Sequence, residues 1–361
     1  MKKYDYLIVG SGLTGAMYAY FLKQLGTVLV VDRNPYIGGL CRTDLYKGIY
    51  QHVYGAHIFR TNDKNVWDFV NSICTFKPFI NTPIAVNGGK VYNMPFNMNT
   101  FAQLYGVVEP QEALKAIKAD CVPCTNPSNL EEYVLSKVGR KVYKELIEGY
   151  TYKQWERECK DLPVSVMSHI PIRLTYDNNY YDEIYQGVPE CGYSDFISRL
   201  LDGCEIVQDE YNRLVYKDVA KHVVYTGALD EYFGYRYGKL EFRSVMFDSK
   251  FYTDIDDKQG VAVFNYTGLD VPYTRSIEHK HFLKEHVKGT LISYEFPATP
   301  DKTGMRIYPI EDKRNLEIFE KYKKLAEDED VLFVGQQADF KSYNMNQIVI
   351  KVLSWARTLK L

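Results

Sequence analysis

Three glycines near the N-terminus are spaced for binding the pyrophosphate of a dinucleotide. Gly10, Gly12 and Gly15 form the pattern GxGxxG, and Asp32 follows about twenty residues later. Gly10 is expected to allow a tight turn, Gly12 to admit the pyrophosphate, and Gly15 to let a helix and a strand pack closely. An acid at the position of Asp32 binds ribose hydroxyls. The spacing therefore predicts a dinucleotide-binding site.

The elements predicted around these glycines are those of a βαβ unit. Residues 4–10 alternate and then run apolar, as a buried parallel strand does, and residues 16–26 predict a helix. Residues 27–32 predict the second strand. The N-terminus of the helix would present free N–H groups and a partial positive charge to the phosphates. A glycine-rich turn in an ordinary βαβ unit is the alternative, which the combined register of these parts makes the weaker interpretation.

A glycine pair, Gly38 and Gly39, follows the acid and indicates backbone lying against a flat or charged ligand. In this feature the chain resembles FAD-binding oxidase-like proteins, where a glycine pair follows the ribose-binding acid. The resemblance favours FAD over a nicotinamide dinucleotide, and no second GxGxxG occurs. The residues expected at the cofactor in this part of the chain are Gly10, Gly12, Leu13, Thr14, Gly15, Asp32, Arg33, Gly38, Gly39 and Leu40.

Histidine and arginine side chains follow directly behind this motif, in residues 50–62. If these residues form a strand, His57 and Arg60 lie on opposite faces. A lone histidine is more often a packed core or surface group than a catalytic one. The position of His57 close behind the dinucleotide fold favours a functional role.

Length and charge limit the classes of function. A chain of 361 residues exceeds one compact core, so two or three domains are expected. The hydrophobic content of 46% and the charged content of 25% are those of a soluble globular protein. A net charge of −2 gives no electrostatic basis for binding nucleic acid or an anionic membrane, so only local basic groups can bind an anionic substrate.

The seven cysteines are scattered and odd in number. Cys121 and Cys124 have CxxC spacing, but no second pair follows, so no metal site is expected. Free thiols in a reducing cytosol are the better interpretation. The N-terminus enters the first strand without a secretory signal, and no apolar run reaches bilayer length. We therefore expect a cytoplasmic location without membrane insertion.

The chain is predicted to be an α/β protein with a discontinuous nucleotide-binding domain. Residues 87–89 predict the turn of a hairpin, and the cap region Asn62/Asp63 predicts the start of a short helix over 63–73. The period becomes helical from residue 98; Ser128 or Asn129 can cap a helix there, and Gly139 can end its first part. Alternating segments in the second half predict an antiparallel sheet. Proline-flanked polar residues make 161–190 a long connection and a candidate lid. The predicted domains are an FAD-binding Rossmann-like domain (1–70, 190–240 and 320–361), a helical substrate-binding insert (98–160) and an antiparallel sheet domain with a mobile loop (71–97, 161–189 and 241–319).

Several short stretches follow the order and spacing of the UDP-galactopyranose mutase family, which the chain resembles over essentially its whole length. No single stretch is specific, but their common order is. The stretches are YGAHIF (54–59), GYTYKQW (149–155), PIRLTYDNNYY (171–181), YQGVPECGY (185–193), YTRSIEHKHF (273–282), YPI (308–310) and YNMNQIV (343–349).

This resemblance implies an isomerase that requires reduced FAD. Family members hold FAD non-covalently and interconvert the six-membered and five-membered ring forms of a nucleotide-diphosphate sugar without net redox. The resemblance implies that flavin N5 attacks the anomeric carbon, that the nucleoside diphosphate leaves, and that the flavin-bound sugar reopens and recloses. A role in surface polysaccharide biosynthesis is expected.

The resemblance also assigns roles to single residues. Arg173 and Arg275 are implied to clamp the diphosphate, because guanidinium groups are always charged and bind phosphate oxygens bidentately; a surface salt bridge is the alternative for each. His57 is implied against the isoalloxazine, and Arg60 is a further candidate catalytic residue beside it. The implied substrate contacts are Tyr150, Thr151, Trp155, Tyr185, Asn265, Tyr308 and Tyr343, and further cofactor contacts are Gly335, Met345 and Asn346.

The departures from the family pattern concentrate around the base, the diphosphate and the sugar. They are Arg60 for a usual histidine, Leu146-Ile147 for aromatic residues, Gln336 for arginine, Asn344 for aspartate and Ser342 for tyrosine. The fold and the flavin chemistry are therefore better supported than the substrate. UDP-galactose, UDP-N-acetylgalactosamine and a dTDP- or GDP-linked sugar all stay open.

Two functions of other classes are the alternatives. One is an FAD-dependent oxidoreductase of the amine-oxidase type, which gives no reason for two phosphate-binding arginines. The other is a nucleotide-sugar-binding protein without catalysis. The expected partner is the nucleotide-sugar substrate; relatives are often homodimers, although the sequence shows no interface signature.

Overall fold

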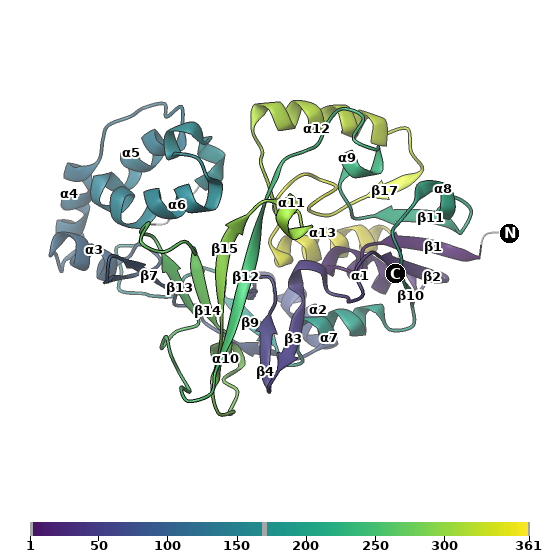
Figure 1. The fold of residues 1–361 in the computed structure, drawn as a ribbon, viewed down its shortest axis with the longest axis horizontal. Helices are drawn as coiled ribbons and strands as arrows, with labels where there is room; N and C mark the ends of the chain where they lie inside the picture. Colours follow the sequence, from purple (N-terminus) through teal and green to yellow (C-terminus); the bar gives the residue numbers. More distant parts are fainter. Residues whose placement is uncertain (1–2, 168–171, 360–361) are drawn as a thin grey trace.

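The computed structural model describes residues 3–167 and 172–359, whose strands form four sheets (Figure 1). A parallel sheet of five strands, in the order β10-β2-β1-β11-β17, carries the glycine motif at one end. Its strands come from the start, the middle and the end of the chain, so the nucleotide-binding fold is discontinuous, as predicted. Their bounds are β1 (Tyr4–Val9), β2 (Val28–Asp32), β10 (Glu205–Gln208), β11 (Ala220–Tyr225) and β17 (Val331–Phe333).

Four helices pack around this sheet and share its hydrophobic core. α1 contacts both α7 and α13. α2 begins at its predicted cap, where Asp63 accepts a hydrogen bond of 2.8 Å from the backbone N–H of Asn65. The helices are α1 (Leu13–Leu22), α2 (Lys64–Ile73), α7 (Gly192–Leu201) and α13 (Met345–Thr358).

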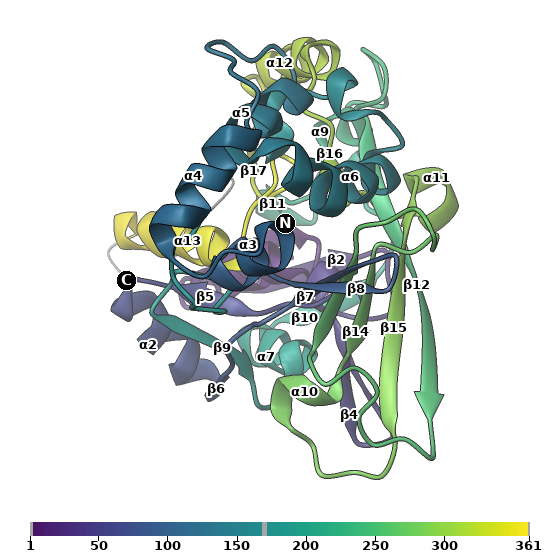
Figure 2. The same ribbon diagram turned by 90° about the vertical axis from the view of Figure 1, so that its left-hand side faces the viewer.

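The second large sheet has seven strands in the order β16-β12-β15-β14-β13-β7-β8 and stands beside the parallel sheet (Figure 2). Its β7–β8 hairpin pairs with β13 in parallel orientation, so the expectation of a purely antiparallel sheet is wrong at this junction. No tight turn connects β7 to β13, and their orientation is therefore free of the hairpin constraint. The bounds are β7 (Ile84–Asn87), β8 (Lys90–Asn93), β12 (Phe242–Tyr252), β13 (Val263–Tyr266), β14 (Arg275–Glu278), β15 (Thr290–Ala298) and β16 (Tyr308–Pro309).

The helical insert has a hydrophobic core of its own. Asn129 caps α5 by accepting a 3.0 Å hydrogen bond from the backbone N–H of Glu132, and Gly139 interrupts the helical geometry, as predicted. The insert lies at one end of the seven-stranded sheet (Figure 1). Its elements are α3 (Met98–Tyr105), α4 (Pro110–Asp120), α5 (Leu130–Val142), the π-helical turn η2 (Tyr143–Ile147) and α6 (Glu148–Trp155).

A small sheet in the order β5-β9-β6 connects the parts around the site. Its strands are β5 (Phe59–Thr61), β6 (Phe76–Pro78) and β9 (Tyr185–Pro189). β6 and β9, which fall in ranges predicted for the sheet domain, thus pair with β5 instead of joining the large sheet. The expected lid falls partly on residues 168–171, which lie outside the described residues.

The strand expected across residues 50–62 is interrupted, which corrects the prediction for His57. β4 (Ile49–His52) ends and β5 begins only at Phe59. Gly55 has a φ of 101° and breaks the extended chain, so His57 lies in a loop.

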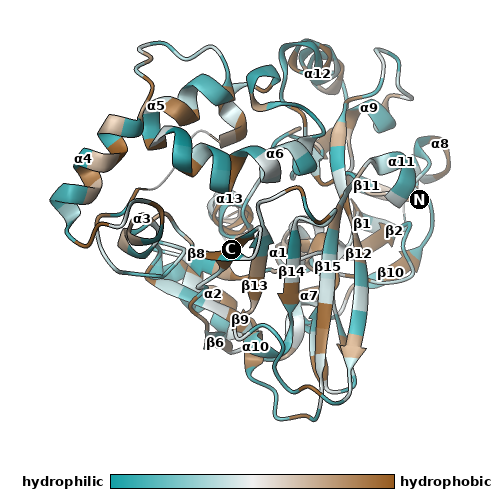
Figure 3. Cartoon of the chain, turned by 60° about the vertical axis from the view of Figure 1, so that its left-hand side comes forward, coloured by the Kyte–Doolittle hydropathy of each residue, from teal (hydrophilic) through white to brown (hydrophobic). Residues whose placement is uncertain are grey.

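The remaining elements are short or lie at the surface. α12 is largely hydrophilic in Figure 3, as its charged sequence predicts, and it buries Tyr322. The elements are β3 (Thr43–Tyr46), α8 (Arg213–Tyr216), α9 (Leu229–Tyr232), α10 (Lys280–Leu283), α11 (Pro300–Thr303), α12 (Lys313–Ala326) and the 3₁₀ turns Gly39–Cys41, Cys159–Asp161 and Val164–Met167.

The cysteine prediction is wrong for one pair. Cys74 and Cys191 form a disulfide between the ends of α2 and β9, which the small sheet brings together although 117 residues separate them in sequence. The other five cysteines are free. The cytoplasmic location loses part of its basis and stays a prediction. Within the described ranges, none of the helices has both the length and the apolar character that a membrane crossing requires.

Candidate active site

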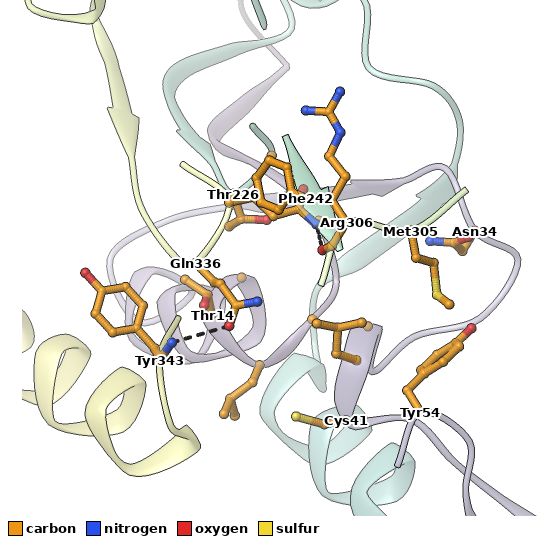
Figure 4. A pocket seen from close by; sticks show the side chains of 18 of the residues that line it. Thr14, Asn34, Cys41, Tyr54, Thr226, Phe242, Met305, Arg306, Gln336 and Tyr343 are labelled. Atoms are coloured by element: carbon orange, nitrogen blue, oxygen red, sulfur yellow. Dashed lines mark hydrogen bonds between the residues drawn. The ribbon is translucent and has the colours of Figure 1, made fainter. Parts of the chain in front are cut away.

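A cavity of about 960 Å³ opens where the parallel strands end (Figure 4). Val9, Val31 and Tyr225, at or next to the carboxyl ends of β1, β2 and β11, all line it. Ligands of open parallel sheets bind at this edge. The predicted site residues that line the cavity are Gly10, Gly12, Leu13, Thr14, Gly15, Asp32, Arg33, Gly39, Leu40, His57, Arg60, Tyr343, Met345 and Asn346.

The glycine motif forms a floor without side chains. Gly12 pairs with Gly38 as an isolated bridge, and a Cβ on Gly12 would have the Cα of Gly39, 3.7 Å away, as its nearest protein neighbour. A Cβ on Gly15 would instead overlap the carbonyl oxygen of Gly10. Gly12 therefore leaves room for a ligand, whereas Gly15 serves the packing of α1 on β1.

The acid at the end of β2 is fixed before any ligand binds. One carboxylate oxygen of Asp32 accepts 2.7 Å hydrogen bonds from the backbone N–H and the hydroxyl of Ser11, and the other accepts from Asn34. Arg33, the next residue, is paired with Glu231 at 2.8 Å and Glu210 at 3.4 Å. These pairs neutralise its charge at the edge of the cavity.

The N-terminus of α13 closes the opposite side. Asn346 lines the cavity, and its buried Oδ1 atom has no hydrogen-bond partner among the described residues. Gly335 approaches the side chain of Thr14 and keeps this wall close to the glycine floor. An orphaned acceptor beside free helix N–H groups suits a ligand edge with both donors and acceptors.

These residues fit an FAD molecule. The floor at Gly12 accepts a pyrophosphate, Asp32 lies at the ribose position, and the polar wall at Asn346 suits the pyrimidine edge of an isoalloxazine ring. The 10-residue helix α1 directs its N-terminus at the same floor.

Buried histidines support the loop that carries His57. The ring Nδ1 of His57 lies 2.6 Å from the carbonyl oxygen of Gly55 and must donate to it, which leaves Nε2 as an acceptor. The backbone N–H of His57 donates to Nδ1 of His52, whose own N–H donates to Nδ1 of His279. Burial lowers the pKa of His57, and the charge of Arg275 acts in the same direction. His57 is therefore neutral at pH 7.

We predict that these histidines make the fold acid-sensitive. Burial lowers the pKa of His52, His57 and His279, the last to about 3. Below about pH 6.5 these histidines are protonated in the unfolded chain but not in the folded chain. The free energy of unfolding therefore decreases as the pH is lowered, by up to about 1.4 kcal/mol per pH unit for each histidine. Urea unfolding at pH 7.5 and 5.5 should show a lower midpoint at pH 5.5. His279→Gln should reduce this difference and His286→Gln, at an exposed position, should not; equal midpoints at both pH values would contradict the prediction.

A row of polar side chains crosses the large sheet beside this loop. The strand register aligns Asn265, Arg275 and Glu295 on three adjacent strands. Arg275 donates from Nε and Nη2 to Glu295, at 2.9 and 2.5 Å, and Nη1 takes no part in this pair. Burial by itself would lower the pKa of Arg275, but the neighbouring carboxylate of Glu295 outweighs burial and raises the pKa of the guanidinium. A Cβ on Gly55 would lie 3.8 Å from Nη2 of Arg275, so the arginine adjoins the His57 loop.

α6 is docked so that Tyr150 faces this arginine. A Cβ on Gly149 would overlap the carbonyl oxygen of Thr267, and Lys153 donates to the carbonyl oxygens of Tyr266, Val271 and Tyr273. Burial raises the pKa of Tyr150, and Arg275 opposes this rise. The same two influences act on Tyr308. Arg275 is thus enclosed by two phenol groups and one carboxylate.

The chain is 35% identical to the dTDP-fucopyranose mutase of Escherichia coli, over 97% of each chain, and 35% identical to a probable UDP-galactopyranose mutase of Klebsiella pneumoniae, over 99% of this chain and 94% of that one. A family model for UDP-galactopyranose mutase matches residues 145–342, and one for an NAD(P)-binding Rossmann-like domain matches residues 8–73. The chain belongs to the UDP-galactopyranose mutase family. A crystal structure of reduced UDP-galactopyranose mutase, 11% identical, shares the fold with a TM-score of 0.74 over 99% of this chain and 95% of that chain.

Membership of the mutase family fixes two of the predictions. The enzyme class is isomerase, and the cofactor is FAD, which the cavity fits. The part matched by the mutase family model contains α6, Arg173, Arg275 and Tyr308. The roles of these single residues stay predictions.

Arg173 and Arg60, predicted near the mutase substrate, are both ion-paired. Arg173 lies 2.5 Å from Asp182. Arg60 lies 2.6 Å from Glu183, and its guanidinium stacks 4.0 Å from the ring centre of Tyr181. Arg60 therefore lines the cavity with its charge paired to Glu183.

Four other predicted substrate contacts have partners elsewhere in the fold. Thr151 is buried and interacts with Cys159 inside the insert, whose core Trp155 also contacts. Tyr185 stacks on Trp67 of α2. The backbone N–H of Tyr343 donates to the side chain of Gln336 (Figure 4). The amide nitrogen of Gln336 donates in turn to the carbonyl oxygen of Ile307. Leu146 and Ile147, at the position of the family aromatics, are buried in the insert core.

Two residues that interact with Arg275 were not predicted as site residues. Glu295 is 1% exposed and is the one charged residue of its strand; a lone acid in such a strand is the signal that could have identified it. Tyr180 interacts electrostatically with Arg275, Arg60 and Arg173. It becomes recognisable only when the fold brings these three arginines together.

Among the residues that the structure describes, one group of metal-ligand type lies outside the cavity. His281 is 3.1 Å from Asp257 and 3.7 Å from Glu278. Glu278 also accepts hydrogen bonds from the backbone N–H groups of Lys258 and Gln259. These groups satisfy one another, and we infer no metal site from them.

Proposed function

We propose that the chain interconverts the pyranose and furanose forms of a nucleotide-diphosphate sugar. The observation that supports this most directly is the position of Arg275, which Glu295 holds charged beside the His57 loop at the edge of the cofactor cavity. A guanidinium whose Nη1 lies outside the pair with Glu295 suits, at this position, the diphosphate of a substrate whose sugar lies against the cofactor.

Each of the residues around Arg275 has a task in this proposal. Arg275 and Arg173 bind the diphosphate and stabilise the charge that develops when it leaves the sugar. The phenols of Tyr150 and Tyr308, whose pKa values are raised by burial, stay protonated and donate to phosphate or sugar oxygens. When bound in the reduced form, FAD supplies the nucleophile for the anomeric carbon.

The neutral His57 completes the wall against the cofactor. Its Nδ1–H is fixed on Gly55, so the ring offers Nε2 as an acceptor and brings no positive charge to the flavin. The hydrogen bonds of its backbone N–H to His52 and of its Nδ1 to Gly55 hold the ring in one orientation.

Candidate substrates follow from the relatives. Two proteins of equal identity to this chain are named for dTDP-fucose and UDP-galactose, so these two nucleotide sugars are the first to test. UDP-N-acetylgalactosamine and a GDP-linked sugar complete the panel. The product furanose would serve surface polysaccharide biosynthesis.

The test is turnover by the flavin-loaded enzyme reduced with dithionite. We expect that it converts at least one nucleotide sugar of the panel into its furanose, detected by chromatography. No conversion of any of them would contradict the proposed function. An amine-oxidase-type activity would instead oxidise the substrate and bleach the flavin stoichiometrically. The homodimer stays a prediction, which sedimentation of the same sample tests.

A further inference from the structure

Three consecutive residues, Tyr181, Asp182 and Glu183, contact two different arginines. Tyr181 and Glu183 both contact Arg60, by ring stacking at 4.0 Å and by an ion pair of 2.6 Å. Asp182, between them, turns to Arg173 and lies 2.5 Å from Nη2. Two acids that are neighbours in sequence thus neutralise arginines from two different parts of the fold.

The flanking contacts fix where Asp182 stands. The side-chain amide of Gln186 donates to the carbonyl oxygen of Glu183 at 2.7 Å, and the backbone N–H of Ile184 donates to Asn62 at 2.8 Å. Together with Arg60 these contacts hold the segment on β5. The carboxylate of Asp182 is therefore presented to Arg173 by an anchored turn.

Both terminal nitrogens of the Arg173 guanidinium donate hydrogen bonds in this arrangement. Nη1 donates to the carbonyl oxygen of Asn179, and Nη2 donates to that of Tyr180 at 3.4 Å as well as to Asp182. The side chain of Arg173 is only 14% exposed, whereas that of Asp182 is 78% exposed. Asp182 therefore covers the guanidinium on its solvent side, where a phosphate from solution has to approach.

We propose that Asp182 is an internal counter-ion that occupies the phosphate position of Arg173 until a diphosphate displaces it, and that it thereby sets the affinity for the substrate. The proposal rests on the proposed function, because it takes Arg173 as a diphosphate ligand. It assigns to Asp182 a role that the family motif does not contain.

The expected interaction energies favour displacement of Asp182 from Arg173 by a diphosphate. An ion pair with one exposed partner contributes little, of the order of 1 kcal/mol or less, because water screens the carboxylate. A diphosphate brings two charges, binds guanidinium groups bidentately and engages Arg275 at the same time. The substrate therefore wins the exchange, and the competition weakens its binding by about two- to fivefold.

The test is Asp182→Asn in the flavin-loaded enzyme. We expect the dissociation constants of UDP and dTDP, measured by calorimetric titration, and the KM of the nucleotide sugar to fall two- to fivefold, with kcat unchanged. Asp177→Asn is the matched control: Asp177 is an exposed acid of the same segment, and its contact is the backbone N–H of Asn179, which an asparagine oxygen can still accept. This control should leave both constants unchanged.

A second background separates competition from a general charge effect. In Arg173→Ala, the Asp182→Asn change should no longer tighten UDP binding, because the guanidinium for which Asp182 and the diphosphate compete is absent. Equal effects of the two asparagine variants, or unchanged or weaker binding in Asp182→Asn, would overturn the proposal and leave the mutase function standing. A wild-type enzyme that binds neither UDP nor dTDP and turns over no nucleotide sugar would overturn both.

Discussion

Replacing Arg275 by alanine is expected to remove turnover and to destabilise the fold at the same time. Turnover should fall by about 10²–10³-fold or more in kcat/KM, because the diphosphate loses its fixed cationic partner when it leaves the sugar. Stability should fall by roughly 3 kcal/mol, because Glu295 is 1% exposed and would be left buried without a counter-charge. Coupled turnover assays and urea unfolding measure the two effects.

A second substitution separates the two losses. In Arg275→Ala combined with Glu295→Gln, the buried charge is gone, so most of the stability should return while turnover stays lost. If the double variant instead regained wild-type kcat/KM, the role of Arg275 at the diphosphate would be refuted. Arg275→Lys keeps a charge but loses the planar fork held by Glu295 and should recover only part of the activity.

Gly12→Val is expected to abolish flavin binding without unfolding the protein. A Cβ on Gly12 would have Gly39 Cα, 3.7 Å away, as its nearest protein neighbour, and the backbone of Gly12 has a φ of −74°, which any residue adopts. The added branched side chain would fill the floor that we assign to the pyrophosphate. The purified variant should be colourless, with a circular dichroism spectrum and an unfolding midpoint equal to those of the flavin-free wild type.

Gly15→Ala is the matched control for this prediction. Its single methyl group would overlap the carbonyl oxygen of Gly10, so the change strikes the packing of α1 on β1. The unfolding midpoint should therefore fall, in contrast to Gly12→Val. A yellow Gly12→Val protein with a full complement of flavin would show that the cofactor does not lie on this floor.

Local sequence patterns predict the cofactor half of this protein well. The strand, glycine turn, helix and acid around Gly12 and Asp32 depend on residues that are neighbours in sequence, and the structure forms them as predicted. The hairpin turn at residues 87–89 and the cap at Asn129 succeed for the same reason, since each is decided by a few adjacent residues.

The features of the site that the sequence does not reveal depend on contacts between residues far apart in the chain. The acid partners of Arg275, Arg173 and Arg60 come from another strand or from residues that a turn brings close, so neither neutralisation nor orientation is visible in a motif. Strand register decides that Glu295 faces Arg275. The bend at Gly55 likewise moves His57 from a strand into a loop.

The disulfide likewise depends on a long-range strand pairing. Cys74 and Cys191 are brought together by pairing of β6 with β9, which no local pattern indicates. The order of several short stretches along the chain indicates the family, whereas single contacts such as that of Tyr185 with Trp67 depend on the fold.

We infer that a reduced flavin beside a clamped diphosphate drives ring interconversion without net redox. To test this, paired aliquots of the flavin-loaded enzyme, one oxidised and one reduced with dithionite, are compared on every nucleotide sugar of the panel. Furanose product should accumulate over many turnovers in the reduced aliquot alone, with the flavin still reduced at the end. Equal furanose formation in both aliquots, or none in either, would contradict it.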